Sequence, residues 1–344
     1  MDIIDSQKSG IPDYVELMLY KFETAKILLE KSFGLKDPLK EGFFYEKGAK
    51  FIDIFIRDIP REHGIASGVV YDEDIKSLKN SLYEGKSLRI TIHRNLIKKT
   101  ATPIHELFHI FQYSYTHFNN MWFMEGLARL AQNLTHKREK KFEKLPSTFE
   151  ELEVLLNKAH DAEYFFRELI SKVENQAEFL KILLENSSIV MKKMQKKYQN
   201  LIWTKEDKKS SLNNIYLLEA IVNSIEILQK SPKDDLLVFL NICKKYIKKN
   251  ENIKKSKTIN ITSPLQLERY EEIEEIEGDL IIENLEINSL NGFNNLKKVN
   301  TIIIKNNSNL HTINGFNSLN QMKNLDAIDS FQIAKEKMKK DRRR

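Results

Sequence analysis

The sequence predicts an α+β fold in which a small β-sheet and a helical part precede a short β-solenoid. Three observations support this prediction. Runs rich in β-branched and aromatic residues lie between residues 51 and 93, helical apolar spacing dominates residues 147–250, and a short sequence repeat follows. We therefore predict one domain over residues 1–250, a repeat module over residues 258–328 and a basic tail over residues 329–344.

A helix and two strands are expected in the N-terminal part. Apolar residues recur at helical spacing over residues 14–31, and Gly34 is typical of a helix end. Residues 51–56 and 88–93 are predicted strands, because β-branched and aromatic side chains pack well on a pleated surface. Residues 84–85, Glu-Gly, are expected to form a turn before the second strand.

Four helical segments are expected to follow and to form a bundle. Their apolar residues recur with the period of an α-helix. The predicted segments are residues 149–158, 162–184, 212–229 and 234–249. Packed together, these segments would supply the wall of a cleft opposite the sheet.

A His-Glu-Leu-Phe-His motif is the strongest chemical signal in the chain. On a helix, His105 and His109 project from one face and can bind one zinc ion, while Glu106 points to the open coordination side. Thr102 and Pro103 are typical of an N-cap and of the first helical position, so a helix is predicted to begin there. The alternative is that both histidines are ordinary polar groups on an amphipathic surface helix.

A second motif, Trp-Phe-Met-Glu-Gly-Leu-Ala, offers a third and anionic ligand in Glu125. The alternative is that a glutamate in a first helical turn is favourable simply because of the helix macrodipole. Gly126 favours the ligand interpretation, because a helical glycine costs about 1 kcal/mol relative to alanine and so indicates a close backbone approach. We expect that approach to be to the neighbouring ligand helix, and we expect Trp122 to pack beneath the site.

Together, the two motifs resemble the paired helix signature of the gluzincin metallopeptidases. The resemblance covers residues 11 to about 190. It implies that His105, His109 and Glu125 bind Zn2+ and that Glu106 is the catalytic base. It also implies that a strand beside the cleft holds extended substrate by backbone hydrogen bonds, and residues 88–93 are the candidate for that strand.

The implied ligand set is chemically suited to hydrolysis. Three protein ligands leave a fourth position for water, whose pKa zinc lowers to about 7. Glu106 can take the released proton and pass it to the leaving amine. A hydrogen-bond donor should then stabilise the tetrahedral oxyanion.

Tyr164 is the candidate for this donor, because the resemblance implies a tyrosine or histidine downstream of the third ligand. The alternative is that Tyr164 is a plain core aromatic. Four other residues compete for the role, namely Tyr113, Tyr115, His117 and His160.

Composition limits the classes of protein to which the chain can belong. A hydrophobic content of 41% suffices to fill the cores of two domains, and no apolar run approaches the length that crosses a bilayer. One cysteine, Cys243, excludes an internal disulfide framework, and the N-terminus lacks the pattern of a secretory signal. A cytoplasmic location is therefore expected, with export through another signal left open.

The net charge of +6 does not indicate a nucleic-acid-binding surface. Residues 334–344 hold seven basic and two acidic side chains, so this segment alone contributes +5. The rest of the chain is therefore close to neutral. A terminal basic cluster is usually a solvated tail, although it can also contact an anionic surface.

The C-terminal repeat predicts the β-solenoid. Residues 285–296 recur as residues 309–319, with Gly292 and Gly315 in register. The isoleucine-rich strands expected before the two copies are residues 279–282 and 301–304. A unit with a strand, an asparagine turn and apolar anchors resembles a receptor L-domain or a leucine-rich-repeat-like module. The module could recognise a substrate or a protein partner, or it could be a structural appendage.

These features predict a zinc-dependent metallopeptidase that acts on a peptide or protein substrate. Internal cleavage is favoured, because the glycine-rich, acid-containing strand motif that the resemblance would require of an aminopeptidase is missing before His105. An aminopeptidase is one alternative. A second is a peptidase-fold binding protein without turnover that uses the repeat for recognition, although a scaffold has no use for Glu106. A third is a helical interaction protein or nucleic-acid-binding protein in which the histidines are incidental.

Overall fold

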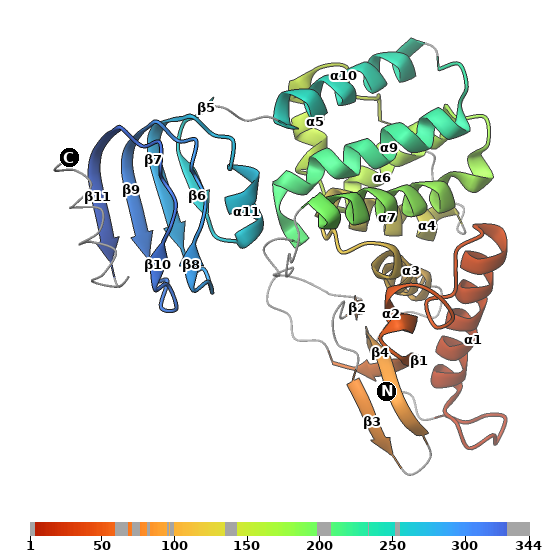
Figure 1. Ribbon diagram of the computed structural model, residues 1–344. Coiled ribbons are helices and arrows are strands. Elements are labelled where there is room, and N and C mark those ends of the chain that lie inside the picture. The colour runs from red at the N-terminus through yellow and green to blue at the C-terminus, as the bar shows by residue number, and fades with distance from the viewer. Residues whose placement is uncertain are drawn as a thin grey trace. The chain divides into compact units, whose positions relative to one another are not determined.

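The computed structural model combines helices and small sheets, and it shows two compact units (Figure 1). One unit comprises residues 1–191 and 216–244, and the other comprises residues 192–215 and 245–344. The described residues are 4–58, 68–70, 76–80, 83–94, 96, 100–134, 143–197, 208–232, 234–251 and 255–328. The predicted basic tail, residues 329–344, lies outside them. Among the described helices, none combines the length and apolar character that a membrane crossing demands.

The N-terminal helix is confirmed. Helix α1 (Asp13–Ile27) continues into one π-helical turn, Leu28–Ser32, and the chain leaves the helical conformation at Gly34, whose φ is +64°. Glycine tolerates this left-handed conformation because it has no Cβ. The apolar face of α1 is buried through residues such as Met18 and Phe22. A short helix, α2 (Phe43–Glu46), follows.

Both predicted strands are present in a four-stranded sheet. β1 (Ala49–Arg57) pairs in parallel with β4 (Tyr83–His93), while β2 (Gly68–Val70) and β3 (Lys76–Asn80) pair antiparallel with β4. The turn predicted at residues 84–85 is wrong, because both residues lie inside β4 and pair with β3.

The position of β4 also contradicts its predicted role as the substrate-holding strand. β4 has β1 on one side and both β2 and β3 on the other, so most of its backbone groups already have partners. Only a strand with a free edge can pair with an extended peptide. Among the described strands of this sheet, β1, β2 and β3 each pair with β4 alone.

Helices α3 (Thr102–Tyr115) and α4 (Met121–Leu134) carry the two motifs. The predicted cap at Thr102 is wrong: Thr102 is already helical, and the N-cap is Ala101, which makes no side-chain cap hydrogen bond. The backbone N–H of Thr102 instead donates to Oγ1 of Thr100 at 3.1 Å. Leu107, Phe108 and the two histidines of the motif are all buried. The alternative of a surface helix is therefore wrong.

The helical part contains more breaks than the apolar spacing predicts. Its helices are α5 (Phe149–Leu156), α6 (Glu163–Ser171), α7 (Phe179–Lys197), α9 (Asn214–Leu228) and α10 (Asp234–Glu251), with short 3-10 turns η2 (His160–Ala162), η3 (Gln176–Glu178) and η4 (Ser211–Asn213). The single segment predicted over residues 162–184 is wrong. Val173 is buried and Glu174 N–H donates to the Gln229 side chain at 3.1 Å, so a tertiary contact replaces helical bonds there.

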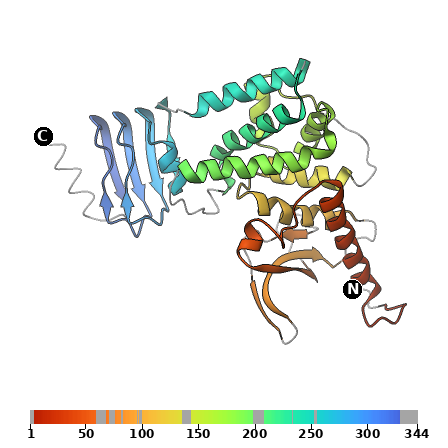
Figure 2. The same cartoon turned by 45° about the vertical axis from the view of Figure 1, so that its right-hand side comes forward.

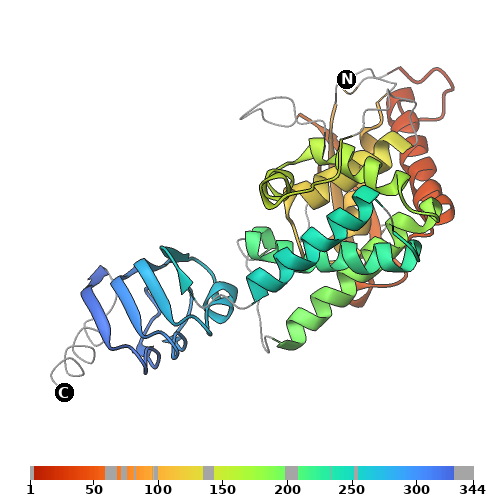
Figure 3. The ribbon, with the colours of Figure 1, turned by 90° about the horizontal axis from the view of Figure 1, so that it is seen from above.

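The C-terminal unit contains a parallel sheet built on the sequence repeat. Its strands are β5 (Lys255–Ser256), β6 (Ile259–Ile261), β7 (Glu275–Glu283), β9 (Lys298–Lys305) and β11 (Gln321–Ile328), and a short helix, α11 (Pro264–Arg269), follows β6. All pair in parallel, and the blue arrows in Figures 2 and 3 run side by side. The pairing extends beyond the two repeat copies that the sequence shows, because β6 and β11 flank them.

The two repeat copies stack directly on each other. β8 (Ser289–Leu290) pairs with β10 (Thr312–Ile313), and the rings of Phe293 and Phe316 stack with centroids 5.5 Å apart. A Cβ atom placed on Gly315 would lie only 2.1 Å from the backbone oxygen of Gly292. The glycine at this position is therefore required by the close approach of the two copies.

Candidate metal centre

Helices α3 and α4 bring the three predicted ligands together. The rings of His105 and His109 lie one helical turn apart, with centroids separated by 4.8 Å. Glu125, in the first turns of α4, faces both rings: its Oε2 is 3.1 Å from Nε2 of His105, and its Oε1 is 3.6 Å from Nε2 of His109. One carboxylate thus stands between two imidazoles that come from another helix.

A third imidazole reaches the same carboxylate. Nε2 of His160, from the turn η2, lies 2.9 Å from Oε2 of Glu125, and its ring stacks on that of His105 with centroids 5.7 Å apart. The ligand atoms of His105, Glu125 and His160 all lie within 4.8 Å of one another, so this group could hold a metal ion. His109 joins the group through the other oxygen of Glu125.

The spacing of these atoms suits a tetrahedral ion. Ligand atoms about 2.0–2.2 Å from zinc at tetrahedral angles are about 3.3–3.6 Å from one another. The three nitrogen–oxygen distances to Glu125, which are 2.9, 3.1 and 3.6 Å, lie close to this spacing. Imidazole nitrogens with one carboxylate form a donor set that zinc accepts. The group of His105, Glu125 and His160 could therefore hold a metal ion, and its donor atoms are of the kinds that zinc accepts.

Gln112 fixes the orientation of His109. Nδ1 of His109 lies 2.8 Å from Oε1 of Gln112, whose amide nitrogen donates to the backbone oxygen of Met124 at 3.1 Å. Because the glutamine oxygen accepts, Nδ1 of His109 is the donor in this bond, and Nε2 of His109 faces Glu125. Sequence reasoning missed Gln112, although its place one turn after His109 on the same helix is a usable signal.

Burial controls the protonation of Glu106. This side chain is buried, and burial raises the pKa of Glu106 to about 7. A carboxylate with a pKa near neutrality can both take and return a proton at neutral pH. Glu106 thus has the acid–base character that a catalytic base requires.

The pKa values of the other ionisable groups in the cluster are also shifted by their surroundings. Burial lowers the pKa of His105 to about 4. Burial works to raise the pKa of Glu125, but hydrogen bonds from His105, His109 and His160 outweigh it and lower the pKa below its ordinary value. Glu125 is therefore an anion and His105 a neutral imidazole at neutral pH, as metal binding needs. Burial works to lower the pKa of His109, but the hydrogen bond and charge of Glu125 outweigh it and raise this pKa, so a metal ion would have to compete with a proton at His109.

Gly126 allows a close contact between α4 and another segment, but this segment is not the one that we predicted. A Cβ atom on Gly126 would lie 2.9 Å from Cβ of Ala162 and 3.0 Å from a ring carbon of Phe166. The expectation of a close approach to the ligand helix α3 is therefore wrong. The absence of a side chain lets η2 and α6 pack against α4, beside Glu125. Trp122 is buried as expected and stacks on Phe166.

A buried polar network holds the same two elements together. Glu163, at the start of α6, accepts a hydrogen bond from Nδ2 of Asn133 on α4 at 2.7 Å and pairs with Arg167. Both Glu163 and Asn133 are buried. Since Glu163 follows His160 by three residues, the network fixes the turn that presents His160 to Glu125.

The remaining candidates for the oxyanion donor occupy varied surroundings. Tyr115 is buried and its hydroxyl accepts from the Lys36 backbone N–H at 2.9 Å, so it is engaged away from the cluster. The ring of His117 packs edge-on against Phe43 at 4.4 Å between centroids. Tyr113 stacks on His109 at 6.1 Å, and Tyr164 is half-buried on α6, one turn after His160.

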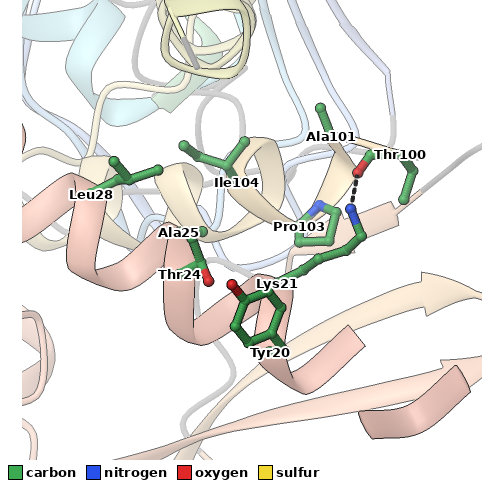
Figure 4. A pocket seen from close by; sticks show the side chains of 9 residues that line it. All are labelled: Tyr20, Lys21, Thr24, Ala25, Leu28, Thr100, Ala101, Pro103 and Ile104. Atoms are coloured by element: carbon green, nitrogen blue, oxygen red, sulfur yellow. Dashed lines mark hydrogen bonds between the residues drawn. The ribbon is translucent and has the colours of Figure 1, made fainter. Parts of the chain in front are cut away.

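A separate cavity lies between α1 and the start of α3 (Figure 4). It has a volume of about 230 Å³, and Nζ of Lys21 crosses it to donate to the Thr100 backbone oxygen at 3.1 Å. Its lining comprises Tyr20, Lys21, Thr24, Ala25, Leu28, Thr100, Ala101, Pro103 and Ile104. None of the histidines lines this cavity, so it is distinct from the metal centre.

Comparison of the chain with protein-family models, with curated proteins and with solved structures finds no match. Conclusions about function therefore rest on the geometry of the site.

Proposed function

We propose that the chain is a zinc-dependent metallopeptidase of the gluzincin type, with endopeptidase activity. The observation that supports this proposal most strongly is the Glu125 carboxylate within 3.1 Å of His105 and 3.6 Å of His109, next to a buried Glu106. His105, His109 and Glu125 would hold the ion. When bound, zinc would supply a Lewis acid and lower the pKa of a water molecule.

Glu106 would then carry the proton. Its raised pKa, near 7, suits a group that accepts a proton from water and returns it to the leaving amine. Tyr164 is our candidate for the donor that stabilises the oxyanion. It lies about one helical turn after His160, the third histidine that contacts Glu125.

The substrate would bind as an added strand. β2 contacts α3, and among the described strands it pairs with β4 alone, so its other edge is our candidate for backbone hydrogen bonds to an extended peptide. We further propose that the C-terminal unit is a β-solenoid of the receptor L-domain or leucine-rich-repeat-like type, available for recognition of the substrate or of a protein partner.

Zinc content and peptide hydrolysis test the proposal together. Protein purified without added metal should contain stoichiometric zinc, and Glu106→Gln should reduce turnover of an unstructured protein substrate by about 100-fold or more, while zinc content stays unchanged. Glu153→Gln, at an exposed glutamate of α5, is the matched control and should keep full activity. Equal rates for wild type and Glu106→Gln would remove Glu106 from the mechanism, and absence of zinc would remove the enzyme proposal altogether.

A further inference from the structure

We propose that His160 is itself a metal ligand, so that the resting centre has a full set of protein ligands and becomes available to substrate only when His160 leaves. This inference rests on the proposed zinc site and adds a regulatory feature to it. The inference is supported by the contacts of His160 and the other histidines with the Glu125 carboxylate, and by the packing that fixes the turn η2.

The distances place His160 at ligand spacing. Its Nε2 lies 2.9 Å from Oε2 of Glu125, closer than His109 lies to Oε1. A donor to the oxyanion would stand about 3 Å beyond a substrate oxygen that is itself about 2 Å from the ion. His160 instead shares one carboxylate oxygen with His105, and the ligand atoms of these three residues lie within 4.8 Å of one another.

The backbone that carries His160 is fixed from two sides. Gly126 leaves no room for a Cβ against Ala162, and Glu163 is bonded to Asn133 of α4 and paired with Arg167. Glu125 and Gly126 are adjacent in the chain, so the element that supplies the carboxylate also positions the turn that supplies the third imidazole. The backbone position of the turn that carries His160 therefore follows from close packing.

Exposure distinguishes His160 from the other imidazoles. Its side chain is 52% exposed, whereas those of His105 and His109 are 10% and 7% exposed. His160 can rotate into solvent without disturbing the core, whereas the other two cannot. Four nitrogen and oxygen ligands complete a tetrahedral zinc site and leave no position for water. Release of His160 would open that position, which makes this residue the point at which substrate or a partner can control the centre.

Nuclear magnetic resonance of the full chain loaded with cadmium and labelled at histidine nitrogens tests the inference directly. The wild type should show a coupling between cadmium and a nitrogen of His160, and His160→Ala should lose that coupling and keep the others. An identical set of couplings in wild type and variant would overturn the inference. Absence of a coupling to His160 in the assigned wild-type spectrum would overturn it as well, and that result does not depend on the stability of the variant.

Metal affinity and turnover provide a second readout. Competition with a chelator should show at least a tenfold loss of zinc affinity in His160→Ala, and hydrolysis at saturating zinc should be equal to or faster than that of the wild type. His311→Ala, at an exposed histidine of the C-terminal unit, is the matched control and should change neither. Zinc affinity within twofold of the wild type would show that His160 is not a ligand. A wild type that binds no metal would instead disprove the proposed function.

Discussion

Two buried polar residues, Asn307 in the C-terminal repeat and His105 in the candidate metal centre, differ in how completely they are hydrogen-bonded. In the repeat, the buried Asn307 side chain donates to the backbone oxygens of Ile282 at 2.9 Å and Lys305 at 2.8 Å, and accepts from Leu285 N–H at 2.8 Å. In the metal centre, by contrast, Nδ1 of His105 is buried with no hydrogen-bond partner among the described residues.

The difference indicates what each set of polar groups is for. A buried group with all its bonds made supports the fold, whereas a cluster of buried, incompletely bonded ionisable groups reduces stability unless a ligand compensates. Perturbed groups of this kind are characteristic of functional sites. Polar residues of the repeat should therefore be needed for stability, and those of the metal centre should be needed for binding and turnover.

The largest expected effect is on the stacking of the repeat. Gly315→Ala should destabilise the C-terminal unit by about 3 kcal/mol or more, because its Cβ would meet the Gly292 backbone oxygen, which cannot move as a side chain would. Gly292→Ala is the matched control: a Cβ there meets nothing within 4 Å, so the expected change is within about 1 kcal/mol. Urea denaturation measures both, and equal effects for the two variants would contradict the stacking.

The second effect concerns Glu106 and pH. Burial raises its pKa from 4.5 to about 7, so the folded metal-free protein binds this proton more tightly than the unfolded chain does. Stability contributed by the protonated form is present below pH 4.5 and is lost as pH rises to about 7. We expect metal-free Glu106→Gln to lack a loss of about 2–3 kcal/mol that the wild type shows over this window. Parallel stability curves for the two proteins would contradict the burial argument.

The third effect tests the role of Asn307. Asn307→Ala removes the partners of two backbone oxygens and one N–H, and it should destabilise the C-terminal unit by about 2 kcal/mol. Asn317→Ala, which loses one exposed bond to Asn294, is the control and should have little effect. Thermal unfolding followed by circular dichroism would measure the change. A loss of stability in Asn317→Ala equal to or larger than that in Asn307→Ala would show that the buried bonds of Asn307 do not stabilise the repeat.

The smallest effect concerns the orientation of His109. Gln112→Ala removes the acceptor of the His109 Nδ1 proton and should weaken zinc binding about 10-fold, as loss of a group that orients a metal ligand typically does. Chelator competition measures this affinity. An unchanged zinc affinity would show that Gln112 only links α3 to α4 and does not support the ligand.

The local parts of the fold and the site could be predicted because they depend on short sequence patterns. The strands β1 and β4 follow from their β-branched and aromatic residues, and the shared face of His105 and His109 follows from helical geometry alone. The break between α6 and α7 could not be predicted, because the contact of Glu174 with Gln229 joins segments distant in the sequence.

The sequence by itself determined that two imidazoles and Glu106 share one helix, that Glu125 follows on the next, and that the repeat copies keep their glycines in register. Only the tertiary structure decided that β4 lies inside its sheet, that Gly126 makes room for Ala162, and that His160 reaches the Glu125 carboxylate. The physical reason is that spacing along a helix fixes which side chains share a face, whereas contacts between elements depend on how separate surfaces pack, and no local pattern records that packing.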